Sequence, residues 1–288
     1  MRNHFKTYIL LGTLSAMFIA IGGLLGKSYL IPFAVLALAF NFAAYWFSDR
    51  IVLALHRVRE IAPQDNFALH KIVEDLARRA DIPKPRLYLM ADEQPNAFAT
   101  GRNPEKGLIA VTSGLLKHMP PRELRSILAH EVAHIRNRDT LVASVAAVMA
   151  GAISYAAQAL SLTWLFGNHT GDDESTLGDV AIVLVAPVMG FLLQMGISRS
   201  REYLADETAA RLTNEPEVLA EALRRLDRCV QTIAPGRANP ATASLFVVNP
   251  FSGKGGVSVL FSTHPPIRLR IRRLKEMMLQ NLHFPGAA

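Results

Sequence analysis

The chain has 288 residues, of which 50% are hydrophobic and only 19% are charged, against roughly 25% charged in an ordinary soluble domain. This composition excludes intrinsic disorder and a coiled coil. The single cysteine, Cys229, excludes a disulfide-stapled module and a cysteine-rich metal site. The net charge of +7 fits either nucleic acid or an anionic membrane surface as a partner.

Four long stretches contain no Asp, Glu, Lys or Arg: residues 7–26, 28–48, 140–169 and 180–198. Each is long enough for a helix that crosses a bilayer core, which needs roughly 20 apolar residues. Buried helices of a soluble protein rarely run this far without a charge. We therefore predict four transmembrane helices in two hairpins, and not a cleaved signal peptide at the N-terminus.

The charges in the loops orient these four stretches. Basic residues lie before the first, after the second, before the third and after the fourth, whereas residues 172–179 between the third and fourth are acidic. The positive-inside rule places the basic side in the cytoplasm, together with both termini. Membrane lipids thus account for the positive charge. Nucleic acid is not expected as a partner, because no aromatic residues interleave with a basic stripe.

This orientation predicts a domain organisation of alternating membrane and cytoplasmic segments. Residues 1–48 and 140–198 each form two transmembrane helices, and residues 49–139 and 199–288 are two cytoplasmic segments of one domain. Hydrophobic periodicity and turn residues predict the elements of these segments. They are helix 65–80, capped by Asp65 or Asn66; strand 86–90; a short extended run 96–100; strand 108–112; a helix from Pro120 and Pro121 towards Asp139; helices 199–212 and 217–231; a long loop 234–263 with short strands; and a basic helix 268–282.

The helix that begins near Pro121 contains His130-Glu131-Val132-Ala133-His134. Histidines four residues apart lie on one helical face, so both imidazoles can bind one metal ion, and zinc suits such ligands. Glu131 adjoins the first histidine and can reach an activated water without binding the metal. It would take a proton from that water and return it to the leaving amine. The alternative interpretation is a helix with two surface histidines.

A catalytic zinc site needs a third protein ligand, and the candidate is Glu202 in the run 198–206. Asp206 follows one helical turn later, where it can accept a hydrogen bond from the second nitrogen of a ligating histidine. The alternative is an ordinary charged helix face. Spacing alone leaves Glu207, Glu215 and Glu217 as rival ligands.

The His-Glu-x-x-His helix, the four uncharged stretches, the Ser-Arg-x-x-Glu-x-x-Ala-Asp run at 198–206 and the Leu-Phe-Ser-Thr-His-Pro-Pro segment at 260–266 together resemble the HtpX heat-shock membrane proteases, relatives of the CAAX prenyl endopeptidases. The resemblance covers nearly the whole chain. It implies an α-rich integral membrane protein with a gluzincin-like α+β zinc protease domain split across two segments. It further implies one zinc ion bound by His130, His134 and Glu202, with Glu131 as general base and Asp206 hydrogen-bonded behind the ligands.

Two further residues are candidates for the site. Asn96 begins a run that resembles the family's strand beside the cleft, where an open strand edge can pair with an extended substrate; it equally suits a turn or cap. His264 is a candidate donor to the oxyanion of the intermediate, or a structural residue before Pro265. Arg199 and Arg201 are candidates to stabilise developing charge, although topology alone explains them.

The sequence therefore predicts a multi-pass zinc endopeptidase of the inner membrane. The resemblance implies that its substrates are misfolded or damaged membrane proteins, which it would hydrolyse at the cytoplasmic face. The alternative is a membrane scaffold with a purely structural zinc. A transporter is disfavoured, since the predicted spans carry no ionisable residue except His169 near the end of one.

Overall fold

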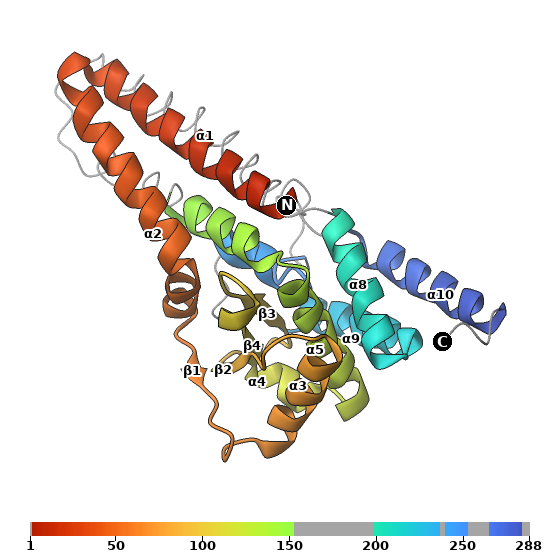
Figure 1. Cartoon of the computed structure of the whole chain (residues 1–288). Coiled ribbons are helices and arrows are strands. Elements are labelled where there is room, and N and C mark those ends of the chain that lie inside the picture. The colour runs from red at the N-terminus through yellow and green to blue at the C-terminus, as the bar shows by residue number, and fades with distance from the viewer. Residues whose placement is uncertain (1, 153–198, 237–239, 253–264, 284–288) are drawn as a thin grey trace.

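The structure, a computed structural model, describes residues 2–152, 199–236, 240–252 and 265–283 (Figure 1). A helical hairpin, α1 (Arg2–Leu25) and α2 (Leu30–His56), extends from a second part that contains a small sheet and several helices. The helices of the second part are α3 (Phe67–Arg79), α4 (Ser113–His118), α5 (Pro121–Arg136), α8 (Arg199–Thr213), α9 (Pro216–Thr232) and α10 (Ile267–His283).

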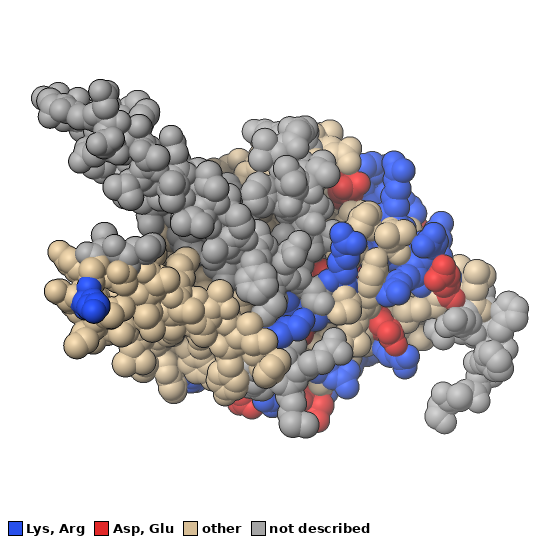
Figure 2. Space-filling model, turned by 90° about the horizontal axis from the view of Figure 1, so that it is seen from above, with Lys and Arg blue, Asp and Glu red and all other residues tan. Residues whose placement is uncertain are grey.

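The hairpin contains the two described helices that are long and apolar enough to cross a membrane, over Phe5–Gly23 and Lys27–His56. From residue 7 to residue 48 the only charged side chain is Lys27, in the turn between the helices. Large apolar side chains face outward, such as Ile31, which is 76% exposed. Figure 2 shows a wide tan surface with blue only at its far tip, whereas blue side chains, with some red ones, gather at the opposite side of the view. Such a surface suits lipid tails better than water.

The predicted third and fourth spans fall mostly outside the described residues. A helix, Thr140–Ala152, begins where the third was expected, and residues 153–198 are not described. Among the described residues, two helices rather than four have the length and hydropathy of a membrane span. The start of the third stretch is packed inside the protein, since Val142 and Val145 are fully buried.

Four strands form one mixed sheet in the order β1-β2-β4-β3. The outer strands β1 (Arg59–Glu60) and β3 (Ala97–Thr100) run antiparallel to their neighbours, whereas β2 (Arg86–Met90) and β4 (Leu108–Thr112) are parallel. Gly101 ends β3 with φ of +131°, where a Cβ would lie 2.5 Å from the Lys106 carbonyl oxygen. The chain can therefore turn back into β4 only through a residue without a side chain.

The sheet has a hydrophobic core on each face. Along β4, Ile109 and Val111 point into a core shared with α3, α5, α8, α9 and α10. Leu108 and Ala110 point into a second core shared with α1, α2 and the helix Thr140–Ala152. This alternation is the period of two that a strand imposes on its side chains. The sheet thus separates the helix with the two histidines from the ends of the apolar helices (Figure 1).

The predicted strands 86–90 and 108–112 and the predicted helices are confirmed with small changes at their ends. Asn66 caps α3, because its Oδ1 accepts a hydrogen bond from the Leu69 N–H at 3.0 Å. Two short elements, β1 and α4, were not predicted, since neither has enough residues to show periodicity. The predicted loop after α9 contains a 3-10 helix, Pro240–Leu245, and an antiparallel bridge between Phe246 and Phe98.

Candidate metal centre and active site

The two histidines lie on the buried face of α5. Proline at the first position of this helix costs little, because its missing N–H would have no partner there. At the other end, Arg138 adopts φ of +58°, and the Asp139 N–H donates to the His134 carbonyl oxygen at 3.0 Å. This is the Schellman type of helix end. It turns the chain back on itself, so that Asp139 lies beside His134.

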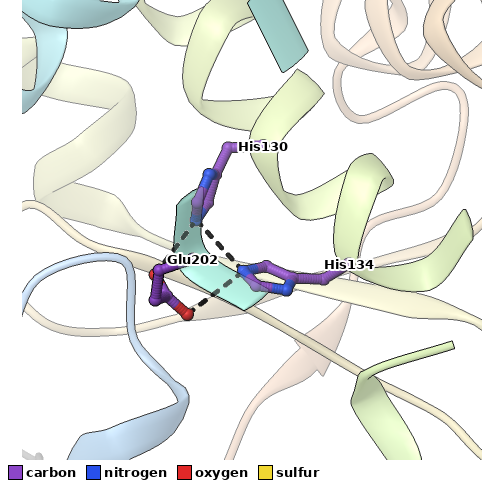
Figure 3. A group of neighbouring side chains, drawn as sticks. All are labelled: His130, His134 and Glu202. Atoms are coloured by element: carbon purple, nitrogen blue, oxygen red, sulfur yellow. Dashed lines mark hydrogen bonds and ion pairs between the residues drawn. The ribbon is translucent and has the colours of Figure 1, made fainter. Parts of the chain in front are cut away.

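The fold brings the three predicted ligands together (Figure 3). The Nε2 atoms of His130 and His134 are 3.1 Å apart. Glu202, in the first turn of α8, places its Oε2 3.7 Å from the first Nε2 and its Oε1 3.6 Å from the second. Because α5 and α8 pack against each other, residues 68 positions apart in sequence share one site.

Each histidine has a carboxylate on its other nitrogen. The Nδ1 of His130 lies 3.0 Å from Asp206 Oδ1, and the Nδ1 of His134 lies 3.0 Å from Asp139 Oδ2. A carboxylate in this position holds the proton on Nδ1, which leaves the Nε2 lone pair for a metal. The sequence predicted Asp206 for this position, and the structure adds Asp139.

This arrangement fits a zinc ion. With both Nδ1 atoms protonated, two Nε2 lone pairs face each other at 3.1 Å, an arrangement that is repulsive unless a cation lies between them. A tetrahedral zinc with bonds of about 2.0–2.1 Å would separate two ligand nitrogens by about 3.3 Å. The observed distances among His130, His134 and Glu202 bracket that value. Two neutral imidazoles and one carboxylate are also a typical zinc donor set.

Burial and charge shape the protonation of the site. Burial raises the pKa of Glu131 to about 7 and lowers the pKa of His130. Burial also disfavours the charged form of His134, but the carboxylates of Glu202 and Asp139 outweigh it and raise that pKa to about 9. Without a metal, the carboxylates thus favour a positive charge on His134. A metal ion supplies the same charge when the histidines are neutral.

A small cavity opens beside the three ligands, and Glu131 lies in its wall. Its lining comes from β3, α5, the helix Thr140–Ala152, α8 and the 3-10 helix after α9. The lining residues are Ala99, Glu131, His134, Asp139, Thr140, Ala143, Arg201, Glu202, Ser244 and Leu245. The arrangement places a carboxylate outside the group of three ligand atoms in the wall of this cavity.

Asn96 lies at the start of β3, and its side chain contacts the chain itself. Its Nδ2 donates to the Val248 carbonyl oxygen at 2.7 Å, and the Val247 N–H donates to the Ala97 carbonyl oxygen at 3.1 Å. Residues 246–248 therefore lie along the outer edge of β3, which the sequence predicted to be open. An extended substrate can pair with the edge of β3 only at positions that residues 246–248 do not cover.

The remaining candidates are placed as follows. Glu207 pairs with Arg211 and Glu215 with Arg122, away from the histidines, so neither belongs to the group of ligand atoms. His264 lies outside the described residues. Arg201, which the sequence assigned to topology, is only 7% exposed and lines the cavity.

Sequence reasoning missed one residue of the site, Arg270 in α10, which is fully buried against Asp206. The sequence does contain a pattern that points to Arg270. Ile267, Ile271 and Leu274 have the spacing of one helical face, and Arg270 falls on that same face. An arginine within an apolar stripe needs a buried partner, because a charged group without one is costly to bury.

Comparison with known proteins agrees with this geometry. The profile of peptidase family M48 matches residues 63–278. A protein described as "Protease HtpX homolog" from Syntrophobacter fumaroxidans is 47% identical over 283 residues, which cover 96% of this chain and 100% of the relative. The protein of the same description from Persephonella marina is 46% identical over 94% of this chain and 96% of its own length.

A solved structure, Ste24p of S. mikatae, has a similar fold, with a TM-score of 0.50 and 18% identity. The similarity covers 95% of this chain and 65% of that one. The match to the family and the relatives extends over the helix with the two histidines, the third ligand and most of the chain. The chain therefore belongs to peptidase family M48, as a membrane zinc metalloprotease homologous to the HtpX proteases.

Proposed function

We propose that this protease hydrolyses peptide bonds in misfolded or damaged membrane proteins at the cytoplasmic face of the inner membrane. One observation carries the catalytic part of the proposal. Glu131 lines the cavity together with His134 and Glu202, and it does not belong to the group of three ligand atoms. A carboxylate in that place can accept a proton from water while the three ligands bind the metal.

In this mechanism zinc, when bound, polarises the scissile carbonyl and makes water a stronger acid. Glu131 accepts the proton from the attacking water and delivers it to the leaving amine. Asp206 and Asp139 keep the protons of the two histidines on Nδ1. Burial of Glu131 disfavours its charged form, which makes it a stronger base towards that proton. His264 remains a proposed donor to the oxyanion.

The position of the site relative to the hairpin supports a membrane-protein substrate. Helix α2 is uncharged up to Ser48 and continues to His56, about 12 Å farther along a helix. There His56 Nε2 lies 2.9 Å from Thr242 Oγ1, and the ring packs on Phe98 of β3 and on Phe246. The cavity thus lies within a short distance of the apolar part of the hairpin, where an unfolded membrane segment would emerge.

A membrane scaffold with a structural zinc is the alternative function. A structural zinc site has four protein ligands, whereas a catalytic site has three and an open position. In the part of the chain that the structure describes, the group of possible ligands has three members. Membership in a peptidase family also favours the enzyme.

Replacement of the proposed base tests the mechanism. We expect Glu131→Gln to lose at least about 10²–10⁴-fold in turnover, because the amide keeps the shape but cannot accept the proton. Bound zinc should stay at one per chain. The matched control is Glu105→Gln, at an exposed site outside the cavity. Wild-type turnover in Glu131→Gln would show that another residue is the base.

The substrate class needs a separate experiment. Purified protein in detergent, with zinc, would be given one membrane protein in its folded and its heat-unfolded form. We expect cleavage of the unfolded form and little cleavage of the folded form. Equal cleavage of both forms would contradict a role in removing misfolded proteins and would leave the assignment of Glu131 unaffected.

A further inference from the structure

Arg270 has an unusual environment for an arginine. It is the largest fully buried side chain in the described part of the protein, with 0% exposure. Its Nε donates to Asp206 Oδ2 at 2.8 Å and its Nη2 to Asp206 Oδ1 at 2.7 Å. Its Nη1 donates to the Val247 carbonyl oxygen at 2.9 Å. Such a paired geometry uses both oxygens of the carboxylate and fixes its plane.

The guanidinium also lies against the metal ligands. Its Nη2 is 3.5 Å from Nδ1 and 3.4 Å from Nε2 of His130, so it flanks the ring and does not cap one nitrogen. Its Nη1 lies 3.6 Å from Glu202 Oε2. Arg270 therefore contacts two of the three metal ligands, and it binds the carboxylate behind one of them.

We propose that Arg270 is a positioning residue of the metal centre. It holds the carboxylate of Asp206 in the plane in which Asp206 accepts the Nδ1 proton of His130. The Nε2 of His130 then keeps its lone pair directed at the metal. Through Val247 the same guanidinium also fixes the segment next to Ser244 and Leu245, which line the cavity. The C-terminal helix is thereby part of the metal centre.

Charge and geometry predict opposite effects of removing Arg270. A positive charge this close to the ligands repels a metal cation, so charge alone predicts tighter zinc binding without it. Geometry predicts weaker binding, because Asp206 would lose the two donors that fix its plane and His130 would lose its orientation. Replacement of such supporting groups typically weakens metal binding about 10–100-fold. The sign of the change therefore distinguishes the two effects.

The decisive variant is Arg270→Lys, measured by zinc affinity in competition with a chelator. Lysine keeps the charge, but its single nitrogen cannot reproduce the planar fork of two nitrogens that fixes both oxygens of Asp206. We expect its zinc affinity to fall about tenfold or more, and that of Arg270→Met to fall at least as far. The matched control is Arg273→Met, one turn along α10, where the guanidinium packs 3.8 Å from the Tyr203 ring centroid. The control should bind zinc like the wild type.

Two further measurements separate positioning from a general loss of folding. The visible spectrum of the cobalt-substituted protein reports the geometry of the ligands, and it should change in Arg270→Lys but not in Arg273→Met. Because Arg270 acts through Asp206, the double variant Arg270→Met/Asp206→Asn should bind zinc within about threefold of the weaker single variant. Wild-type affinity in Arg270→Lys, tighter binding in Arg270→Met, or fully additive losses in the double variant would each overturn the proposal. These readouts do not depend on the substrate.

Discussion

The side chains of the metal centre are arranged in pairs, each histidine with its own carboxylate. His130 faces Asp206 from a different helix, and His134 faces Asp139 from the end of its own helix. Asp206 has a pKa below its ordinary value, because Arg270 outweighs the effect of burial. A charged carboxylate at that place keeps the imidazole proton on Nδ1.

The assignment of Glu202 as the third ligand can be tested by replacing single residues. Glu202→Ala should lose most of its bound zinc, because one of three protein donors disappears and no other carboxylate of the described residues joins the group. Glu207→Ala is the matched control. Its carboxylate is 45% exposed and pairs with Arg211 on the outside of the same helix. The measurement is the amount of zinc bound per chain in each purified variant. Full zinc occupancy without Glu202, or loss without Glu207, would contradict the assignment.

At the scale of elements, the position of α5 depends on polar contacts at its surface as well as on the core. Arg125 of α5 hydrogen-bonds to Asp75 of α3, which also pairs with Arg78 and Arg79. Hydrogen bonds from Arg125 and Arg78 lower the pKa of Asp75 to about 2. The two helices are therefore joined by an ion pair that persists to low pH.

This ion pair predicts a pH-dependent stability. Because the folded pKa of Asp75 lies below its ordinary value of 3.8, its contribution is present near pH 7 and is lost as the pH falls through about 4 towards 2. Asp75→Asn should lower stability at pH 7 by about 1 kcal/mol, a value reduced for solvent screening. The thermal midpoints of variant and wild type should converge as the pH falls to about 2. Glu74→Gln, at a side chain 67% exposed, is the control. If the difference between the two thermal midpoints did not change with pH, the charge of the Asp75 carboxylate would not be the source of the stabilisation.

At the scale of the whole molecule, α2 joins the apolar hairpin to the catalytic sheet. Its outer half exposes large apolar side chains, and its last turns are buried at Val52 and His56. Arg102 stacks over the Trp46 ring at 4.2 Å, where an aromatic and a basic residue suit the interface of a membrane. One continuous helix thus sets the distance between the bilayer and the cavity.

The orientation of the chain in the membrane is a prediction from its loop charges. In a Cys229→Ser background, an impermeant reagent should label Asp173→Cys in intact cells, because the acidic loop is expected outside. Lys84→Cys, exposed between α3 and β2, should be labelled only after the cells are permeabilised. The reverse labelling pattern would show that the topology is inverted. It would also place the metal centre on the other side of the membrane.

The sequence by itself determined the features that depend only on residues close together in the chain. The strands 86–90 and 108–112, the helix with His130 and His134, and the two apolar helices of the hairpin follow from periodicity and composition, because each repeats within a few residues. Spacing also placed Glu202 and Asp206 on one helical face, but it left Glu207, Glu215 and Glu217 as rival ligands.

Only the tertiary structure decided how distant segments meet. Nothing local in residues 246–248 indicates that they lie along β3, because Asn96 and Val248 are 152 positions apart. The pairing of Arg270 with Asp206 spans 64 positions, and the apolar stripe of α10 signals that Arg270 needs a buried partner without indicating which residue it is. Asp139 could be assigned to His134 only once the left-handed turn at Arg138 was seen. The physical reason is common to all three. A buried polar group needs a partner, and packing rather than sequence proximity chooses which one it finds.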